Sequence, residues 1–287
     1  MGEVKAVNGS DNPFLAPSLD SLYGGADRLA ARTSALGLAK VSGRSVPVTV
    51  AQLAVEHSSA DAPVRAVADI GCGRGTSSRV LVERLCPRRL TAVDASRAMV
   101  AKARERVGTT PGSKTDFVQA DFHHLPLRAG AYDLVSAAFC LYHSARPSQV
   151  LAEFARVLDH RGVVILVTKS ADSYRELDSL VVSAGLDPDA LHRESLYAAA
   201  HSGNIASLAA GAFDVLHVEH EEHCFRFTDL AHVAAYLATN PKYHLPPGLS
   251  GDAEAISEAL RLRLPDVPVA ASSVVTYVVA RPPGARR

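Results

Sequence analysis

Short apolar runs alternate with amphipathic helical segments between residues 65 and 170, and this alternation limits the folds open to the chain more than any other feature. The apolar runs, which we predict to be strands, are residues 65–70, 90–94, 115–120, 132–139 and 163–168. Helical periodicity is found at residues 76–85, 96–107 and 148–158. Such alternation is typical of a doubly wound α/β fold, in which helices cover both faces of a mainly parallel sheet.

The segments on either side add early helices and a looser C-terminal part. After an irregular arm, helices are predicted at residues 26–39 and 47–57. The C-terminal part is predicted to contain helices at 173–184, 195–210, 228–239 and 253–264 and strands at 215–227 and 272–280. We therefore expect an N-terminal arm with helices (1–60), a core (61–170), and a helical cap that also supplies the last two strands (171–287).

Composition excludes several classes of protein. Lys and Arg number 30, as do Asp and Glu, so the chain lacks the basic field of a nucleic-acid binder. There is no run of about 18 apolar residues and no apolar segment at the start, so we expect neither a membrane span nor a signal peptide. The isolated cysteines fit a reducing cytoplasm better than a disulfide or zinc framework. These are Cys72, Cys86, Cys140 and Cys224.

A glycine-rich turn follows the first predicted strand and opens the first helix of the core. It reads Asp69-Ile-Gly71-Cys-Gly73-Arg-Gly75, at the place where a doubly wound sheet binds a nucleotide-like ligand. Glycine allows the backbone to approach a ligand closely. Asp94 ends the next strand, 19 positions after Gly75, where its carboxylate can accept both hydroxyls of a ribose.

The spacing of this turn argues against a dinucleotide. The G-x-G-x-x-G fingerprint would require glycine at position 76, where Thr76 stands. Asp69 would also repel a pyrophosphate, whereas it would accommodate a ligand that carries an amino group. A turn that only packs the strand against the helix is the other reading.

These motifs, together with Asp121-Phe122 after the third strand, resemble the class I S-adenosylmethionine-dependent methyltransferases of the small-molecule type. The resemblance is close over residues 65–170, looser in the late strands and weakest in the cap. It implies a seven-stranded sheet, with residues 61–170 as the cofactor-binding core. It also implies that the glycine turn passes under the methionine moiety of the cofactor and that Asp94 binds its ribose. Asp121 would accept a hydrogen bond from the adenine amino group, with Phe122 against the ring. The full set of expected cofactor-binding residues is Tyr23, Asp69, Gly71, Cys72, Gly73, Gly75, Asp94, Ala95, Asp121, Phe122 and Ala138.

A general base is needed if the methylated atom must lose a proton. Histidine suits this role near neutral pH, and His143 follows the fourth strand at the edge where the methyl group should point. His143 is therefore the catalytic candidate, with a structural histidine as the alternative. His123 and His124 lie beside Asp121, so solvent or cofactor contact suits them better. Tyr23 would fold over the cofactor, or is an ordinary tyrosine of the arm.

Two further patterns are not assigned a function. The alternating His217, Glu219, Glu221 and His223 would share one face of a strand, which we expect to be solvated or turned toward the cap, with no metal site. The segment Asn240-Pro-Lys-Tyr243 resembles the N-P-P-Y box of amino-methylating enzymes that act on nucleic acids, but that box belongs directly after the fourth strand. We therefore expect no metal and no nucleic acid.

The function expected from the sequence is methyl transfer to an oxygen, nitrogen or activated carbon atom of a small-molecule acceptor. We expect this acceptor to be an aromatic compound or a specialised metabolite. The cap and the early helices are long enough to close a pocket of that size. The alternatives are a protein that binds S-adenosylmethionine but catalyses cyclisation, and a non-catalytic partner subunit. A homodimer is left open.

Overall fold

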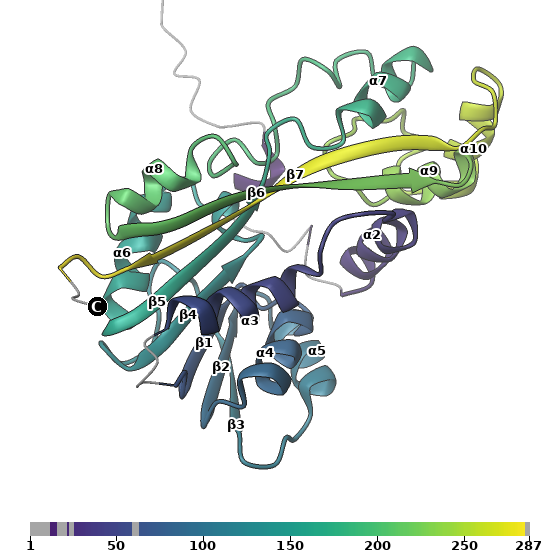
Figure 1. Ribbon diagram of the computed structural model, residues 1–287. Helices are drawn as coiled ribbons and strands as arrows, with labels where there is room; N and C mark the ends of the chain where they lie inside the picture. Colours follow the sequence, from purple (N-terminus) through teal and green to yellow (C-terminus); the bar gives the residue numbers. More distant parts are fainter. Residues whose placement is uncertain (1–11, 16–21, 23–25, 59–62, 285–287) are drawn as a thin grey trace, which may run out of the picture.

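The computed structural model describes residues 12–15, 22, 26–58 and 63–284 (Figure 1). Tyr23 lies outside the described residues. A seven-stranded sheet forms the centre, in the order β3-β2-β1-β4-β5-β7-β6. The first five strands are parallel, and β7 is antiparallel to both of its neighbours. The strands are β1 Ala66–Ile70, β2 Arg89–Asp94, β3 Lys114–Gln119, β4 Tyr132–Ala138, β5 Leu158–Lys169, β6 Asp214–Phe227 and β7 Val269–Arg281.

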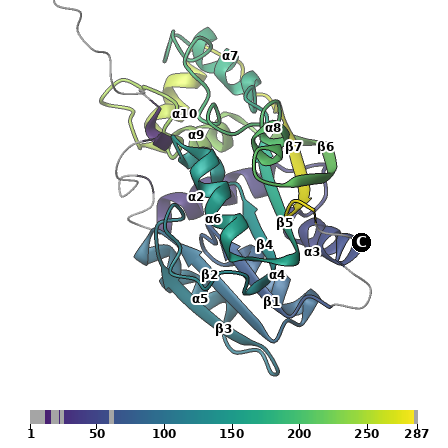
Figure 2. The ribbon, with the colours of Figure 1, turned by 90° about the vertical axis from the view of Figure 1, so that its left-hand side faces the viewer.

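Helices cover both faces of this sheet, which confirms the doubly wound fold. One face packs against α3 (Val46–His57), α4 (Thr76–Leu85) and α5 (Arg97–Val107), where Leu81 and Leu90 are fully buried. The other face packs against α6 (Pro147–Val157) and α8 (Ile205–Ala210) (Figure 2). Residues 163–167 of β5 are buried throughout, as the continuous β-branched run predicts.

The strands β6 and β7 extend beyond the rest of the sheet as a two-stranded ribbon. Pairing of β5 with β7 ends at Lys169 and Val275, whereas β6 and β7 stay paired as far as Phe227 and Val269. Figure 1 shows the ribbon running from the central sheet to the cap helices. These are α2 (Ala26–Ala39), α7 (Arg175–Ser183), α9 (Leu230–Leu237) and α10 (Ala253–Arg261).

The cap has its own hydrophobic core, built on the ribbon. Phe225 and Phe227 of β6 are buried there against Tyr174, Leu230 and Tyr236. The N-terminal helix α2 belongs to this core, because it packs on α9 and lies close to β6. The two helices predicted at 26–39 and 47–57 therefore belong to different hydrophobic cores, because α2 packs in the cap and α3 packs on the sheet.

The predicted helix at residues 195–210 is wrong for most of its length, because only α8 is helical there. Side chains in the preceding turns satisfy the backbone in a way that competes with a helix. The Ser195 hydroxyl donates to the carbonyl of Ala171 and accepts from the amide of Tyr197. The Asn204 carbonyl oxygen accepts from the amide of His201, and the helix begins only after that residue.

Candidate cofactor and acceptor site

A cavity of about 920 Å³ lies at the carboxyl edge of the parallel strands and reaches into the cap. Doubly wound sheets bind ligands at this edge. From the core, the cavity is lined by most of the residues predicted from the sequence. These are Gly71, Cys72, Gly73, Asp94, Ala95, Asp121, Phe122, Ala138 and His143.

The three glycines of the turn have positive φ angles but different surroundings. A Cβ atom on Gly71 (φ +67°) would lie 2.4 Å from the Cβ of Cys140, and one on Gly75 (φ +76°) would lie 2.8 Å from the Cα of Ala103. A Cβ atom on Gly73 (φ +52°) would meet nothing within 4 Å. Two glycines thus allow the turn to pack against the protein, while Gly73 leaves its bare backbone facing the cavity. This cradle fits the cofactor that the resemblance implies.

Asp94 ties the end of β2 to this turn. Its carboxylate accepts the Gly73 amide at 2.9 Å with one oxygen and the Ser96 amide at 2.9 Å with the other. Burial raises the pKa of Asp94, and the two amide hydrogen bonds oppose that shift. A carboxylate oxygen has more than one acceptor position, so Asp94 keeps acceptor capacity for the hydroxyls of a ligand.

Asp69 lies behind the turn and not in the cavity wall. Its side chain is 1% exposed and accepts a hydrogen bond from the Ser78 hydroxyl of α4. Burial raises the pKa of Asp69 to about 6, despite the hydrogen bond from Ser78. The geometry therefore supports a positioning role, in which Asp69 links β1 to α4 beneath the glycines. Gly75 also lies outside the cavity wall and acts through packing.

Asp121 and His123 form a pair at the outer end of the cavity. One Asp121 oxygen accepts from the His123 amide and lies 2.7 Å from its ring nitrogen Nδ1. The other ring nitrogen of His123 lies 2.8 Å from the Ser144 hydroxyl. Burial would raise the pKa of Asp121, but the hydrogen bonds and charge of His123 lower it. The Phe122 ring packs edge-on against His123 at 4.9 Å, so these residues form a polar edge beside an aromatic face.

His143 lines the cavity from the short helix that follows β4. Its Nδ1 atom lies 3.2 Å from the carbonyl oxygen of Phe14, which can only accept, so Nδ1 carries the proton. The ring packs against Phe14 at 4.5 Å and Tyr142 at 4.8 Å. Burial lowers the pKa of His143 to about 4. The imidazole is therefore neutral at pH 7, with Nε2 as its basic nitrogen.

A second set of residues lines the cavity on the side of the cap, and we call it the cap wall; its residues were not predicted from the sequence. Arg32 of α2, Lys169 at the end of β5, Tyr197, Tyr236 and Asn240 all line the same cavity. One signal was available, because Lys169 ends a parallel strand at the carboxyl edge. Asn240 contributes from the cap, where its amide donates to the Tyr236 hydroxyl at 2.8 Å.

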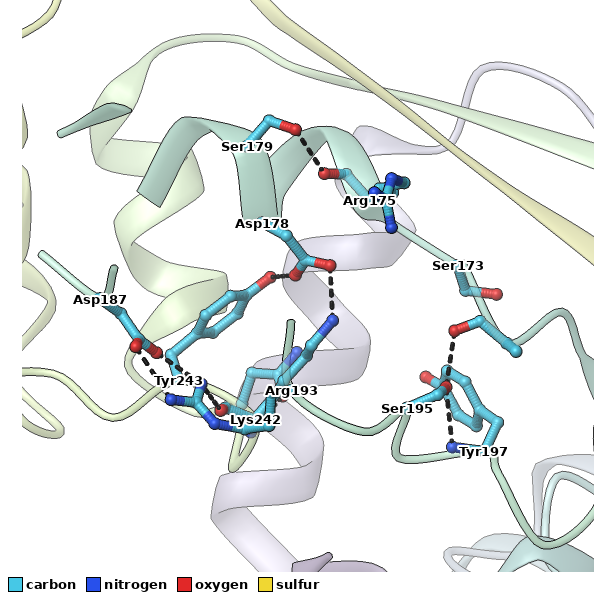
Figure 3. A network of polar contacts seen from close by, with 12 residues as sticks. Ser173, Arg175, Asp178, Ser179, Asp187, Arg193, Ser195, Tyr197, Lys242 and Tyr243 are labelled. Carbon is cyan, nitrogen blue, oxygen red and sulfur yellow. Dashed lines mark hydrogen bonds and ion pairs between the residues drawn. The ribbon is translucent and has the colours of Figure 1, made fainter. Parts of the chain in front are cut away.

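Two buried ion pairs hold the cap wall in place (Figure 3). Lys242 and the Tyr243 hydroxyl both donate to Asp178 of α7, which is 4% exposed. Arg193 donates from two nitrogens to Asp187, which is 3% exposed, and also to the carbonyl of Lys242. This network joins the segment after α7 to the loop after α9. It therefore holds in place the segment that carries Tyr197, whose side chain lines the cavity.

The histidine-rich face of β6 lies against the segment between α2 and α3. Arg44 donates to both Glu219 and Glu221, and His217 stacks near His57 at 5.4 Å. Within the part of the chain that the structure describes, no group of three His, Cys, Asp or Glu side chains could hold a metal ion. None of the helices described there combines the length and apolar character that a bilayer crossing requires.

Comparisons with known proteins find methyltransferases similar to part of this chain. A family model for methyltransferase domains matches residues 68–166. A malonyl-acyl-carrier-protein O-methyltransferase of Legionella pneumophila is 31% identical over 115 residues, which cover 40% of this chain and 40% of that protein. The corresponding enzyme of Herminiimonas arsenicoxydans is 30% identical over 168 residues, covering 58% of this chain and 60% of its own length. The match to a Streptomyces fradiae transposon protein is 35% identical and covers 39% of this chain and 32% of that protein. The chain thus spans well under two thirds of the length of these relatives.

Solved structures with the same fold cover more of the chain at lower identity. A Bacillus halodurans protein described as a candidate methyltransferase has a TM-score of 0.56 and 15% identity, covering 83% of this chain and 99% of its own. The 4+2-cyclase SpnF also has a TM-score of 0.56, with 17% identity over 96% of this chain and 98% of its own. These likenesses show the fold, and the family match covers the glycine turn and the strands beside it. Residues 68–166 of this chain therefore match the methyltransferase domain family, and the chain around them has the fold of these solved structures.

Proposed function

We propose that this chain transfers a methyl group from S-adenosylmethionine to an oxygen, nitrogen or activated carbon atom of a small-molecule acceptor. The observation that carries the proposal is the single cavity that joins the glycine turn to the cap wall of Lys169, Tyr197 and Tyr236. Its volume of about 920 Å³ is at the upper end for pockets that hold cofactors and drug-sized ligands. Cofactor and acceptor can therefore share one cavity.

The cofactor is proposed to lie along the core side of this cavity. The bare backbone of Gly73, with Cys72, passes under its methionine part, and Asp94 accepts from its ribose hydroxyls. Asp121 and Phe122 bind the adenine edge and face, with Ala95 and Ala138 as apolar contacts. Gly71 lines the cavity and lets the turn pack on Cys140, while Gly75 and Asp69 support the turn from behind. When bound, the cofactor supplies a methyl group on a sulfonium sulfur, open to in-line attack.

The remaining chemistry is done by the protein's own residues. The cap and the short helix after β4 (Leu141–His143) align the acceptor with the methyl carbon and exclude water. His143 is proposed to take the proton of the acceptor at Nε2, because its Nδ1–H is held by the carbonyl of Phe14. A buried, uncharged imidazole is ready to accept a proton without first losing one.

Replacing His143 with alanine should slow methyl transfer by about hundredfold or more, because a positioned base usually contributes about 10²–10⁴-fold. In the unaltered enzyme, the acidic limb of the rate should fall near pH 4 and not near 6.5, because burial keeps this histidine neutral down to its lowered pKa of about 4. A pH–rate profile in single-turnover conditions measures both. A loss smaller than tenfold, or an acidic limb that survives in the variant, would assign His143 a structural role.

Replacing Asp94 with alanine should weaken binding of S-adenosylhomocysteine by about tenfold, because charge-assisted hydrogen bonds contribute on the order of 1–3 kcal/mol. Calorimetric titration gives the affinity, and Asp116→Ala is the control. Asp116 is a half-buried carboxylate of the neighbouring strand β3, paired with Lys114, and is not among the residues that line the cavity. Unchanged affinity in the Asp94 variant would refute this placement of the cofactor.

The acceptor class rests on charge and on the relatives. The chain has a net charge of zero, which does not favour a nucleic-acid acceptor. The relatives named as malonyl-acyl-carrier-protein O-methyltransferases make oxygen the first acceptor atom to test. We also propose a cytoplasmic location, because all four cysteines are free thiols. Light scattering would decide whether the chain forms a homodimer.

Label transfer tests the proposed function directly. Protein and methyl-labelled S-adenosylmethionine are incubated with separated small-molecule, RNA and protein fractions of the native cell. Label in the small-molecule fraction supports the proposal and gives a product to identify. Label in RNA or protein would refute the acceptor class. No label in any fraction, with S-adenosylhomocysteine still bound, would favour cyclisation or a non-catalytic subunit.

A further inference from the structure

Lys169 places a positive charge at the cap end of the cavity. It is the last residue of β5, and its ammonium lies 4.8 Å from the ring of Tyr174, 5.2 Å from that of Phe139 and 5.9 Å from that of Tyr197. It donates one hydrogen bond, to the Tyr174 hydroxyl at 2.6 Å. An ammonium has three N–H donors, so two have no acceptor among the residues that the structure describes.

Among the residues that the structure describes, this cation also has no acidic partner: no carboxylate lies within ion-pair distance of Lys169. Two other cations of the cap, Lys242 and Arg193, are paired with Asp178 and Asp187. Burial lowers the pKa of Lys169; Tyr197 opposes this shift and the nearby charge of Arg32 adds to it. An ammonium removed from water without an anion is costly unless something supplies the missing charge.

The charges that line the cavity are separated along its length. The carboxylates Asp94 and Asp121 lie on the core side, at the ends of β2 and β3. Lys169 lies at the end of β5, which β1 and β4 separate from β2 in the sheet. Arg32 faces the same cavity from α2, so two cations meet in the cap wall. The other lining cations, Arg74 and Arg146, belong to the glycine turn and the loop before α6.

We propose that Lys169, together with Arg32, binds a carboxylate of the acceptor, so that the substrates are small organic acids with a planar or aromatic body. This inference rests on the proposed function, because it identifies the substrate class of the same site. The rings of Phe139 and Tyr197, which line the cavity beside the ammonium, provide flat apolar surfaces for the body of such an acid. The carboxylate would accept the two remaining Lys169 N–H bonds and hold the acceptor in one orientation.

The carboxylate is assigned to the acceptor and not to the methionine part of the cofactor. The glycine turn under the cofactor follows β1, whereas Lys169 ends β5 beyond β4 and is surrounded by Tyr174 and Tyr197 of the cap. A cofactor carboxylate would make the same ion pair, so the experiment must separate the two sources. Affinity for S-adenosylhomocysteine does this, because that product carries the methionine carboxylate but no acceptor.

The test compares matched acids and amides on protein saturated with S-adenosylhomocysteine. Benzoate, 4-hydroxybenzoate, cinnamate and 2-naphthoate are titrated beside their primary amides by calorimetry. The same titrations are made on Lys169→Met, which keeps the length of the side chain without its charge, and on Lys114→Met. Lys114 is 75% exposed on β3, so its variant controls for the loss of one positive charge.

At least one acid should bind tenfold or more tightly than its amide. Lys169→Met should lose tenfold or more of the acid affinity while affinity for the amide and for S-adenosylhomocysteine stays within twofold, and Lys114→Met should change none of these. Equal binding of acids and amides, or binding of neither, overturns the inference. Loss of S-adenosylhomocysteine affinity in Lys169→Met overturns it too, by assigning the ion pair to the cofactor. Unaltered protein that fails to bind S-adenosylhomocysteine refutes the proposed function instead.

Carbon-13 NMR of lysine Cε atoms gives an independent readout. The Lys169 signal is assigned by its absence in Lys169→Met, and its pH titration is followed with and without the best-binding acid. The bound acid should raise the pKa of Lys169 by one unit or more, because a carboxylate favours the charged amine. An amine that stays neutral at pH 7 with the acid bound would overturn the carboxylate site and point to Lys169 as a base.

Discussion

Replacing Gly71 with alanine should lower the free energy of unfolding by about 3 kcal/mol. A left-handed φ angle costs an L-residue about 1–2 kcal/mol, and forcing an extra carbon into a packed interior costs about 1–3 kcal/mol more. Both apply at Gly71, because its φ is +67° and the new Cβ would lie 2.4 Å from the Cβ of Cys140. Urea denaturation measures the loss.

Replacing Gly73 should give the opposite balance of effects. Its φ is +52°, but the new Cβ would meet no protein atom within 4 Å, so the stability loss should be about 1 kcal/mol. Affinity for S-adenosylhomocysteine should fall by about tenfold or more, since the methyl group would occupy space proposed for the cofactor. Gly130→Ala is the matched control. It has a φ of +62°, open space around the Cβ, and no place in the cavity wall, so its affinity should not change.

The two glycine variants together distinguish packing from binding. If Gly73→Ala binds S-adenosylhomocysteine as well as Gly130→Ala does, the backbone of the turn does not face the cofactor. If Gly71→Ala is as stable as Gly73→Ala, the close approach to Cys140 does not require a glycine.

Replacing Arg193 with methionine should lower the free energy of unfolding by about 3 kcal/mol, because it leaves a buried carboxylate without its cation. Asp187 is 3% exposed and accepts from two Arg193 nitrogens. Burial would raise the pKa of Asp187, but these hydrogen bonds lower it. The ion pair therefore stabilises the folded state at pH values above the ordinary pKa of an aspartate. This stabilisation is lost as the pH falls through the lowered pKa.

The control for this variant is Arg79→Met. Arg79 pairs with Glu83 on α4, but both side chains are more than half exposed, so solvent screens the pair and the loss should be much smaller than for Arg193. Urea denaturation at pH 7 compares the two. Equal losses would mean that the Asp187 pair does not hold the cap wall. Asp187→Asn in the Arg193→Met background should then recover part of the stability, since it removes the orphaned charge.

The parallel core could be predicted from the sequence because its signals are local. The five strands give short apolar runs, the glycine turn follows the first of them directly, and Asp94 ends the second. The carboxyl ends of parallel strands meet at one edge, so the residues after them gather without further information. The late strands were also predicted, but the extension of β6 and β7 beyond β5 was not, because strand length does not specify the pairing partner.

The cap wall could not be predicted in the same way. Arg32, Lys169, Tyr197 and Asn240 come from four separate segments, and only tertiary packing brings them together. The side-chain hydrogen bonds of Ser195 and Asn204 replace a helix that the periodicity favoured. Asp69 shows a subtler limit, because a carboxylate beside a ligand-binding turn can point into the cavity or away from it, and the sequence pattern is the same.

The ribbon of β6 and β7 affects the order in which the protein can be completed during synthesis. The strands β1 to β5 occupy one continuous stretch, so their sheet can begin to form while the rest of the chain is still being made. The cap core needs α2 near the start of the chain and Ala271 of β7 near its end. The apolar face of α2 must therefore stay uncovered until β6 and α9, on which it packs, have left the ribosome. A nascent or truncated chain that ends before β7 would have the glycine turn, but β6 would lack the strand it pairs with and the cap wall would not be held in place.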